Sequence, residues 1–363
     1  MDHAFGVGEP FRVGLEEELF LVDPADGHRL AHVAEAVIPA LGLPEGAAGF
    51  EAFASEVELR SPPCATAAEA VEALGRGRAA VAAAGATALA AGLHPAGALG
   101  DARLVDRERY RRVGGELRGL LQRTPECALH VHVGMPDAET AIRVCNGLRA
   151  HLPLLAGLAA NSPFWFGRDS GMASARAALV RAYPGRGVPP AFRDFADYEQ
   201  ALESTLRAAG MEDRTQLWWD VRPHARLGTV EVREMDAQTE LRDVLPLAAL
   251  VHCLARHEAE RTAPLDLASG PLGWSTFRAA RDGLDAEVLD EAGSVRPLRD
   301  VARATLARLG TIAGELGATD ALGHVERILR EGGAAAGQRA EHERSGMPGL
   351  LRSLAARTRG EAP

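Results

Sequence analysis

The 363-residue sequence predicts an α+β fold in a single domain. Short strand-like segments alternate with helical ones over the first two-thirds of the chain, and from about Thr239 onward the pattern is almost wholly helical. No internal repeat, heptad run or low-complexity linker marks a boundary between domains. We therefore expect one domain over residues 1–357, mixed in structure over 1–238 and mostly helical over 239–357, and a disordered tail over 358–363.

The composition is that of a globular chain long enough to bury a core, with 47% hydrophobic and 25% charged residues. No apolar run reaches the roughly 18 uncharged residues that cross a bilayer, and the Ala-rich stretch 79–93 is too short and too weakly hydrophobic. The amino terminus lacks the features of a secretory signal, and the four cysteines never occur as Cys-x-x-Cys. We expect a cytoplasmic protein with free thiols and no membrane association.

The charge pattern excludes several functions. The formal net charge of -10 disfavours nucleic acid as a partner, because such a surface repels the phosphate backbone. All 40 basic residues are arginine, so the chain has no lysine for a phosphate-binding loop, a Schiff base or a kinase-type strand. Any nucleotide chemistry must therefore depend on arginine and metal ions.

Several local sequence patterns predict where helices begin and end. Thr66 and Glu69 form a capping-box pattern that predicts an Ala-rich helix to about Ala91, and Asp137 predicts the start of a helix that runs to about Ala160. The Pro- and Gly-rich segment 183–190 is typical of an irregular surface loop. Further helices are expected near 196–209, 240–261, 274–284, 297–315, 318–331 and 335–357.

Four predicted strands carry one apolar face and one face of ionisable residues, because side chains alternate with a period of two. The first strand, 11–22, is apolar at its odd positions except Glu17 and presents Glu16 and Glu18 on the other face. The remaining three are 55–61 with Glu56, Glu58 and Arg60, 128–135 with His130 and His132, and 228–235 with Thr229, Glu231 and Arg233.

One such strand would only indicate a face turned to water. Four of them concentrate residue types that bind metals and phosphates, and these side chains converge if the strands share one sheet. Crowded carboxylates repel one another unless cations neutralise them, so the pattern predicts bound metal. Oxygen-dominated ligation with an imidazole suits Mg²⁺ or Mn²⁺ better than Zn²⁺.

Several segments together resemble the carboxylate–amine ligase family that includes type 2 glutamate–cysteine ligases. They are Gly14–Phe20, Ser55–Leu59, Gly92–Pro95, Glu108–Tyr110, His130–Gly134, Asn161–Pro163, Trp219–Pro223 and Gly228–Asp236. The resemblance implies a glutamine synthetase-type and guanidino kinase-like fold, in which a curved antiparallel sheet holds the site on its concave face and helices cover the other face. Two positions depart from the family pattern: Glu17 stands where the family has an apolar residue, and Glu51 where it has aspartate.

The resemblance also implies roles for individual residues. The residue expected to meet the transferred phosphoryl group is Arg233, and His132 and Arg222 are expected on the nucleotide side. Arg176 resembles a binder of a substrate carboxylate. The implied metal ligands are Glu16, Glu18, Glu58, His130 and Glu231, with Glu51 as a further one.

The expected activity is ATP-dependent ligation of a carboxylate to an amine through an acyl phosphate, with Mg²⁺ or Mn²⁺ as the metal and glutamate plus cysteine as the first substrate pair. The partners are then small molecules, and the resemblance implies a homodimer. Three alternatives stay open: a metal-dependent amidohydrolase, a guanidino phosphotransferase and a non-catalytic ligand-binding homologue. Hydrolysis is disfavoured because it needs neither Arg222 nor Arg233 beside Glu231. The walls of the amine pocket are expected in loops within 164–195, where the sequence has no readable pattern.

Overall fold

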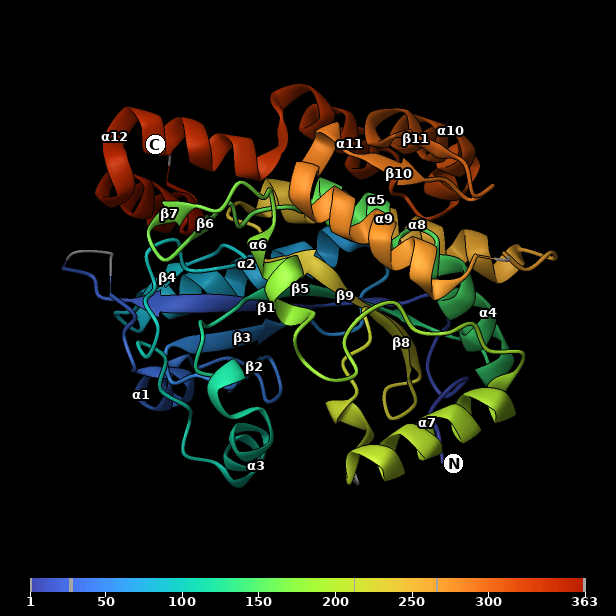
Figure 1. The fold of residues 1–363 in the computed structure, drawn as a ribbon, viewed down its shortest axis with the longest axis horizontal. Helices are drawn as coiled ribbons and strands as arrows, with labels where there is room; N and C mark the ends of the chain where they lie inside the picture. Colours follow the sequence, from blue (N-terminus) through green and yellow to red (C-terminus); the bar gives the residue numbers. More distant parts are fainter. Residues whose placement is uncertain (1, 26–28, 212, 266, 362–363) are drawn as a thin grey trace.

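An antiparallel sheet runs through the middle of the molecule (Figure 1). This computed structural model describes residues 2–25, 29–211, 213–265 and 267–361, and within them the main sheet has seven strands. Their order is β2 (Ala48–Gly49), β3 (Glu56–Arg60), β1 (Val13–Val22), β5 (Ala128–Gly134), β9 (Thr229–Asp236) and β8 (Val221–His224), and β4 (Thr87–Leu89) pairs with β1. The predicted α+β class is confirmed, and the four predicted strands are consecutive neighbours.

The register of these strands places the ionisable residues on one face. On β1, Glu16 lies opposite His130 of β5, and Glu18 lies opposite Glu58 of β3. On β9, Glu231 lies opposite His132. Directly opposed residues of antiparallel strands point to the same side of the sheet, so these side chains share one face.

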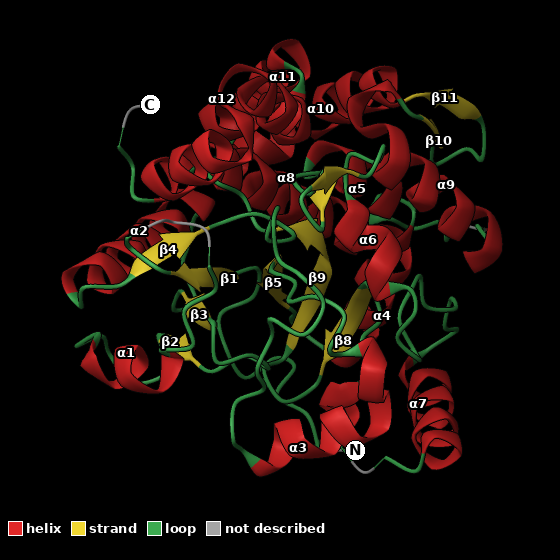
Figure 2. Ribbon diagram, turned by 60° about the vertical axis from the view of Figure 1, so that its left-hand side comes forward, coloured by secondary structure: helices red, strands yellow, loops and turns green. Residues whose placement is uncertain are grey.

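Helices cover the other face of the sheet (Figure 2). Those that pack on the sheet include α2 (Ala67–Ala83), α4 (Ala138–Arg149) and α8 (Leu241–Glu260). In turn, α10 (Leu298–Glu315) and α11 (Thr319–Glu331) pack on α8. The odd-numbered residues Val13, Leu15, Leu19 and Leu21 of β1 are buried in the resulting core. The remaining elements are α1 (Ala34–Ala40), α3 (Glu108–Leu117), α5 (Leu152–Leu158), α6 (Ala175–Val180), α7 (Phe195–Ala209), α9 (Ser269–Asp282), α12 (Gly333–Thr358) and the hairpins β6 (Phe164–Trp165) with β7 (Arg168–Asp169) and β10 (Glu287–Leu289) with β11 (Val295–Pro297).

Two predicted helices were too long. The helix expected to reach Ala91 ends at Ala83, because Gly85 takes a positive φ of 78° and the chain then enters β4. The helix expected over 137–160 is divided into α4 and α5, and Pro153 stands in the first turn of α5, where its missing N–H is tolerated.

Glu17 lies on the helix-covered face of β1, where it forms a buried ion pair with Arg78 of α2. The Nε and Nη2 atoms of Arg78 donate to the two Glu17 carboxylate oxygens at 2.9 and 2.5 Å. Its remaining hydrogen bonds go to the carbonyl oxygens of Gln238, Thr239 and Thr358 at 2.7, 2.7 and 3.1 Å. Arg78 thus neutralises the charge of Glu17 inside the core, which explains how an acidic residue can stand where the family has an apolar one. Thr358, the first residue of the expected tail, is buried and belongs to α12.

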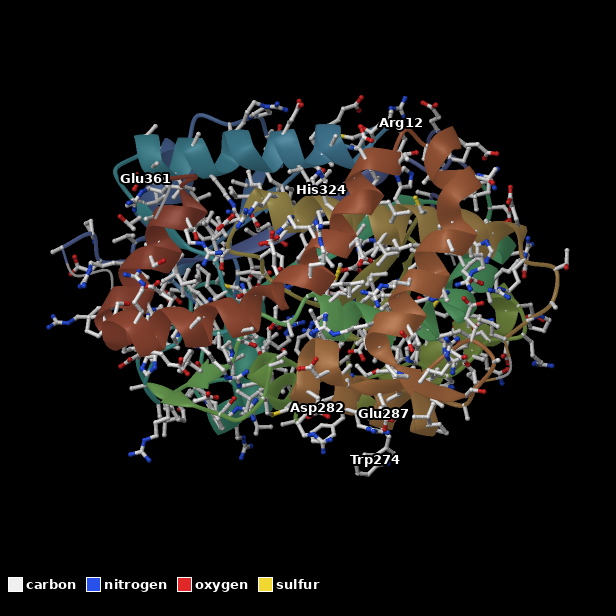
Figure 3. All side chains as sticks on the ribbon, turned by 90° about the horizontal axis from the view of Figure 1, so that it is seen from above. Arg12, Trp274, Asp282, Glu287, His324 and Glu361 are labelled. Carbon is white, nitrogen blue, oxygen red and sulfur yellow. The ribbon has the colours of Figure 1, made fainter. Side chains whose placement is uncertain are left out.

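The outer helices present charged side chains to solvent (Figure 3). Trp274 of α9 projects from this surface and is 72% exposed. Among the described residues, no helix has both the length and the apolar character required to span a bilayer. All four cysteines have free thiols, as expected, and all four are buried.

Candidate active site

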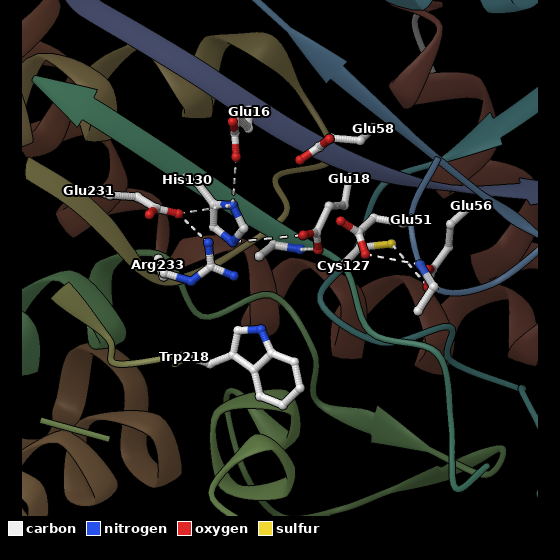
Figure 4. A network of polar contacts seen from close by, with 12 residues as sticks. Glu16, Glu18, Glu51, Glu56, Glu58, Cys127, His130, Trp218, Glu231 and Arg233 are labelled. Atoms are coloured by element: carbon white, nitrogen blue, oxygen red, sulfur yellow. Dashed lines mark hydrogen bonds and ion pairs between the residues drawn. The ribbon is translucent and has the colours of Figure 1, made fainter. Parts of the chain in front are cut away.

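All ten predicted site residues line one cavity on the ionisable face of the sheet. Figure 4 shows Glu16 and Glu18 of β1 pointing toward His130 of β5, with Glu58 of β3 near them. Glu231 and Arg233 of β9 lie on the other side of the imidazole. The residues brought together are Glu16, Glu18, Glu51, Glu58, His130, His132, Arg176, Arg222, Glu231 and Arg233.

His130 joins two sets of residues that fit divalent cations. In each set the ligand atoms lie within 4.8 Å of one another: Glu16, His130 and Glu231 in one, and Glu18, Glu58 and His130 in the other. The Nδ1 atom of His130 is 3.3 Å from a Glu16 oxygen, and its Nε2 atom is 3.7 Å from a Glu18 oxygen. Such oxygen-rich sets with one imidazole suit Mg²⁺ or Mn²⁺.

Two carboxylates of this cavity, Glu18 and Glu58, have raised pKa values, although Arg60 pairs with Glu58. Burial, and then the nearby Glu51, raise the pKa of Glu18 to about 8. Burial together with Glu16 raises the pKa of Glu58 well above its ordinary value. A divalent cation bound between these carboxylates would favour their ionised form and so lower both pKa values. Glu51 lines the cavity but belongs to neither of the two sets.

The opposite wall is basic and centres on Glu231. Arg222 donates from Nε to Glu231 at 2.7 Å, and Arg233 donates to the other oxygen of the same carboxylate. These two guanidinium groups outweigh burial and hold the pKa of Glu231 well below its ordinary range. The Nη1 atom of Arg222 is occupied by the carbonyls of Thr215 and Leu217, so Arg222 orients Glu231 from a fixed position.

His132 lies between the acidic and the basic walls. Its Nε2 atom is 3.5 Å from a Glu16 oxygen and 3.8 Å from a Glu231 oxygen, and its Nδ1 atom lies 3.0 Å from the Thr229 hydroxyl. For the neighbouring His130, burial and Arg233 lower the pKa to about 3, which keeps that imidazole in the neutral form that binds metals.

Arg176 supports the end of β9. Its Nη1 atom donates to the Glu234 carbonyl at 3.2 Å and lies 3.5 Å from an Asp236 oxygen. Asp236 in turn accepts hydrogen bonds from Ser162 and Ser174 at 2.7 and 3.0 Å. The Arg176 Nε atom is buried without a hydrogen-bond partner among the described residues.

A third cluster of potential metal ligands lies outside the cavity. His151, Glu258 and Glu291 meet there, with His151 Nε2 at 3.0 Å from Glu258. Arg261 pairs with both carboxylates at 2.6 and 2.5 Å, and Arg308 also pairs with Glu291. The guanidinium groups neutralise both acids, and none of the three residues lines the cavity.

Several other residues that line the cavity have no role predicted from the sequence. Glu56 and Arg60 share the alternation of Glu58 on β3, and this pattern could have identified them. Glu126, Tyr183, Arg186 and Trp218 lie outside the regular elements, so no periodicity marked them. The segment expected as a surface loop over 183–190 in fact buries Tyr183 and turns Arg186 toward the cavity.

Comparison with known sequences gives consistent matches along the chain. A family model described as glutamate-cysteine ligase family 2 matches residues 12–354. A Rubrobacter xylanophilus protein, provisionally named glutamate–cysteine ligase 2-1, is 38% identical over 93% of this chain and 91% of its own. The glutamate–cysteine ligase of Haloferax volcanii is 35% identical over 94% of this chain and 95% of its own.

Solved structures share the fold at low sequence identity. The Francisella tularensis glutamate–cysteine ligase, crystallised in complex with AMP, superposes with a TM-score of 0.74 at 13% identity, over 96% of this chain and 88% of that one. The bifunctional glutathione synthetase of Pasteurella multocida gives a TM-score of 0.67 at 17% identity, over 96% of this chain and 52% of that one.

Proposed function

The chain belongs to glutamate–cysteine ligase family 2, and from this premise we propose that it joins the side-chain carboxylate of glutamate to the amine of cysteine. The enzyme class is that of an ATP-dependent ligase that forms a carbon–nitrogen bond through an acyl phosphate. Because the family match extends over both the mixed and the helical parts, we also propose that they form one catalytic domain.

The observation that supports this function most strongly is that one cavity has both a wall of potential metal ligands and a wall of arginines. Carboxylates and an imidazole on β1, β3 and β5 offer sites for divalent cations, and Arg233 on β9 faces them. Bound Mg²⁺ or Mn²⁺ would neutralise the ATP polyphosphate and let a substrate carboxylate approach it. We assign this metal to Glu16, Glu18, Glu58, His130 and Glu231.

In the first step, an oxygen of the substrate carboxylate attacks the γ-phosphorus of ATP, the bond to the β-phosphate oxygen breaks, and ADP leaves. Arg233 stabilises the negative charge on the equatorial oxygens of the moving phosphoryl group, a task that suits its planar guanidinium. Arg222 keeps Glu231 oriented from the far side. In the second step the amine nitrogen attacks the acyl carbon, phosphate departs, and the amine loses a proton as the amide forms.

The function is tested by measuring ADP release from the purified protein with ATP and Mg²⁺. We expect release to require a carboxylate and an amine together, with glutamate plus cysteine active, and to be accompanied by equal amounts of phosphate. A guanidino phosphotransferase would release ADP without phosphate, and an amidohydrolase would work without ATP. A ligand-binding homologue would show none of these reactions, and any of the three results would contradict the proposal.

Replacing Glu58 by glutamine tests the metal assignment. The change removes one negative ligand from the set around His130, so the Mg²⁺ concentration for half-maximal ADP release should rise about 10- to 100-fold. The matched control is Glu72→Gln, on the exposed side of α2, which should leave the Mg²⁺ titration unchanged. If the two variants titrate alike, Glu58 is not a metal ligand.

A further inference from the structure

Arg60, at the end of β3, contacts both of the residue sets that fit divalent cations. Its Nη2 atom donates to a carboxylate oxygen of Glu58, and its Nε atom lies 3.8 Å from an oxygen of Glu16. Glu58 belongs to one set and Glu16 to the other, and Arg60 lies directly opposite Glu16 in the register of β1 and β3. One guanidinium group therefore reaches potential metal ligands on two adjacent strands.

This guanidinium group is more exposed than those of the other arginines that pair with potential metal ligands. Arg222 and Arg233 both donate to Glu231, and their side chains are 10% and 13% exposed. The Arg60 side chain is 36% exposed, and it also lines a neighbouring cavity of about 300 Å³. Arg60 can therefore leave the carboxylates by rotating its own side chain, without disturbing the core.

Gly49 of β2 provides the space in which the guanidinium group lies. A Cβ atom at this position would be 2.7 Å from both Nη atoms of Arg60, which is closer than side-chain atoms approach one another. The φ angle of Gly49 is not positive, so the backbone itself does not require glycine here. The missing side chain is instead explained by the position of Arg60.

A guanidinium group and a divalent cation compete for the same carboxylate oxygens. A lone pair that Glu58 gives to Arg60 is lost to a metal, and two cations on one carboxylate repel each other. The polyphosphate of ATP offers Arg60 other partners, since a planar guanidinium group binds phosphate oxygens well. ATP that arrives together with the metal would therefore end the competition.

We propose that Arg60 competes with the divalent cation for Glu58 and Glu16, and that it transfers to the phosphate groups when metal and ATP bind together. This inference rests on the proposed function, which supplies the metal and the nucleotide. Metal alone then binds weakly, and the metal and the nucleotide each strengthen the binding of the other. Arg60 thereby makes tight metal binding depend on the nucleotide.

Replacing Arg60 by glutamine should shift two binding equilibria in opposite directions. For Mn²⁺ alone, followed by the electron paramagnetic resonance signal of the free ion, the dissociation constant should fall at least about 10-fold, because the competing cation is gone. For AMPPNP, a non-hydrolysable ATP analogue, the dissociation constant measured by calorimetry in saturating Mg²⁺ should rise at least about 5-fold, because the phosphates lose a partner.

The matched control is Arg12→Gln, because the Arg12 side chain is 34% exposed and pairs with Glu9, which belongs to neither set. This control should change either dissociation constant by less than about 2-fold. A merely structural role of Arg60 predicts the opposite sign for Mn²⁺, since a misplaced Glu58 would bind metal less tightly. Unchanged or weaker Mn²⁺ binding in Arg60→Gln overturns the proposal, and so does unchanged or tighter binding of AMPPNP.

Gly49→Ala provides a second variant if Arg60→Gln does not fold. The added methyl group takes the space of the guanidinium group, and because Arg60 already contacts Glu58, its side chain must move away from the carboxylates. Mn²⁺ alone should then bind at least about 3-fold more tightly although the arginine is still present. Unchanged or weaker Mn²⁺ binding in this variant overturns the proposal.

Neither binding measurement includes glutamate or cysteine, so the result does not depend on turnover. If glutamate plus cysteine yields no ADP while the two opposite shifts appear, the ligase function fails and the role of Arg60 stands. If ADP and phosphate are released while the shifts are missing, the role of Arg60 fails and the ligase function stands. Wild-type protein that binds neither Mn²⁺ nor AMPPNP would overturn both.

Discussion

Replacing Arg233 by alanine should lower the rate of ADP release by about 1,000-fold or more while the fold stays intact. The side chain lies in the cavity, where it donates to Glu231 across from the carboxylates of β1 and β3. Although burial acts against the charged form, Glu231 and then Glu18 raise the pKa of Arg233, so the guanidinium is charged at any working pH. Its loss removes the positive charge that faces the moving phosphoryl group.

Steady-state kinetics and a thermal unfolding curve together check this prediction. Arg233→Lys should recover part of the rate, because it keeps the charge without the planar fork. The control Arg193→Ala removes an arginine whose side chain is 79% exposed, and it should retain wild-type turnover. Wild-type turnover in Arg233→Ala would remove this residue from the mechanism, and a matching loss of folded protein would make the effect structural.

Replacing Arg78 by alanine should destabilise the protein by roughly 3–5 kcal/mol, because Glu17 would then be a buried charge without a partner. The three backbone carbonyls that Arg78 satisfies would also lose their donor. For a chain of this length such a loss corresponds to a fall in Tm of about 5 °C, measured by differential scanning calorimetry.

The control for this prediction is Arg76→Ala, at an exposed position on the same helix, and it should shift Tm by less than about 1 °C. The double replacement of Glu17 by leucine and Arg78 by methionine should recover part of the lost stability, because no charge is then left buried. An unchanged Tm in Arg78→Ala would mean that water or a rearranged side chain neutralises Glu17.

The sheet and its ionisable face could be predicted because both follow from a local rule. Side chains alternate along a strand, so Glu16, Glu18, Glu58, His130 and Glu231 were assigned to one face of their strands from the sequence. Whether those faces coincide depends on strand order and register, which the pattern does not encode. The family resemblance implied that the strands form one antiparallel sheet with the site on a single face. The structure shows the four strands side by side in one such sheet.

The rest of the site could not be predicted, because it depends on contacts between distant segments. Glu126 and Arg186 lie outside regular elements, where no period relates a residue to a face. Glu17 broke the apolar pattern of its strand, and only the position of Arg78, 61 residues away, explains how the core accommodates it. The prediction that the Ala-rich helix extends to Ala91 was wrong for the same reason. Pairing of β4 with β1 is a contact between distant segments, and it outweighed the helical preference of the Ala-rich sequence.

The hydrogen bonds of Arg78 also bear on how the protein refolds. The guanidinium gathers acceptors 61, 160, 161 and 280 residues away in the sequence, so its environment forms only after several long loops have closed. An incompletely folded state without α12 would leave this buried guanidinium without the Thr358 carbonyl, and one in which β1 and α2 had not yet packed together would leave it without Glu17. The same arginine thereby favours an all-or-none transition, in which sheet and helical cover gain order together.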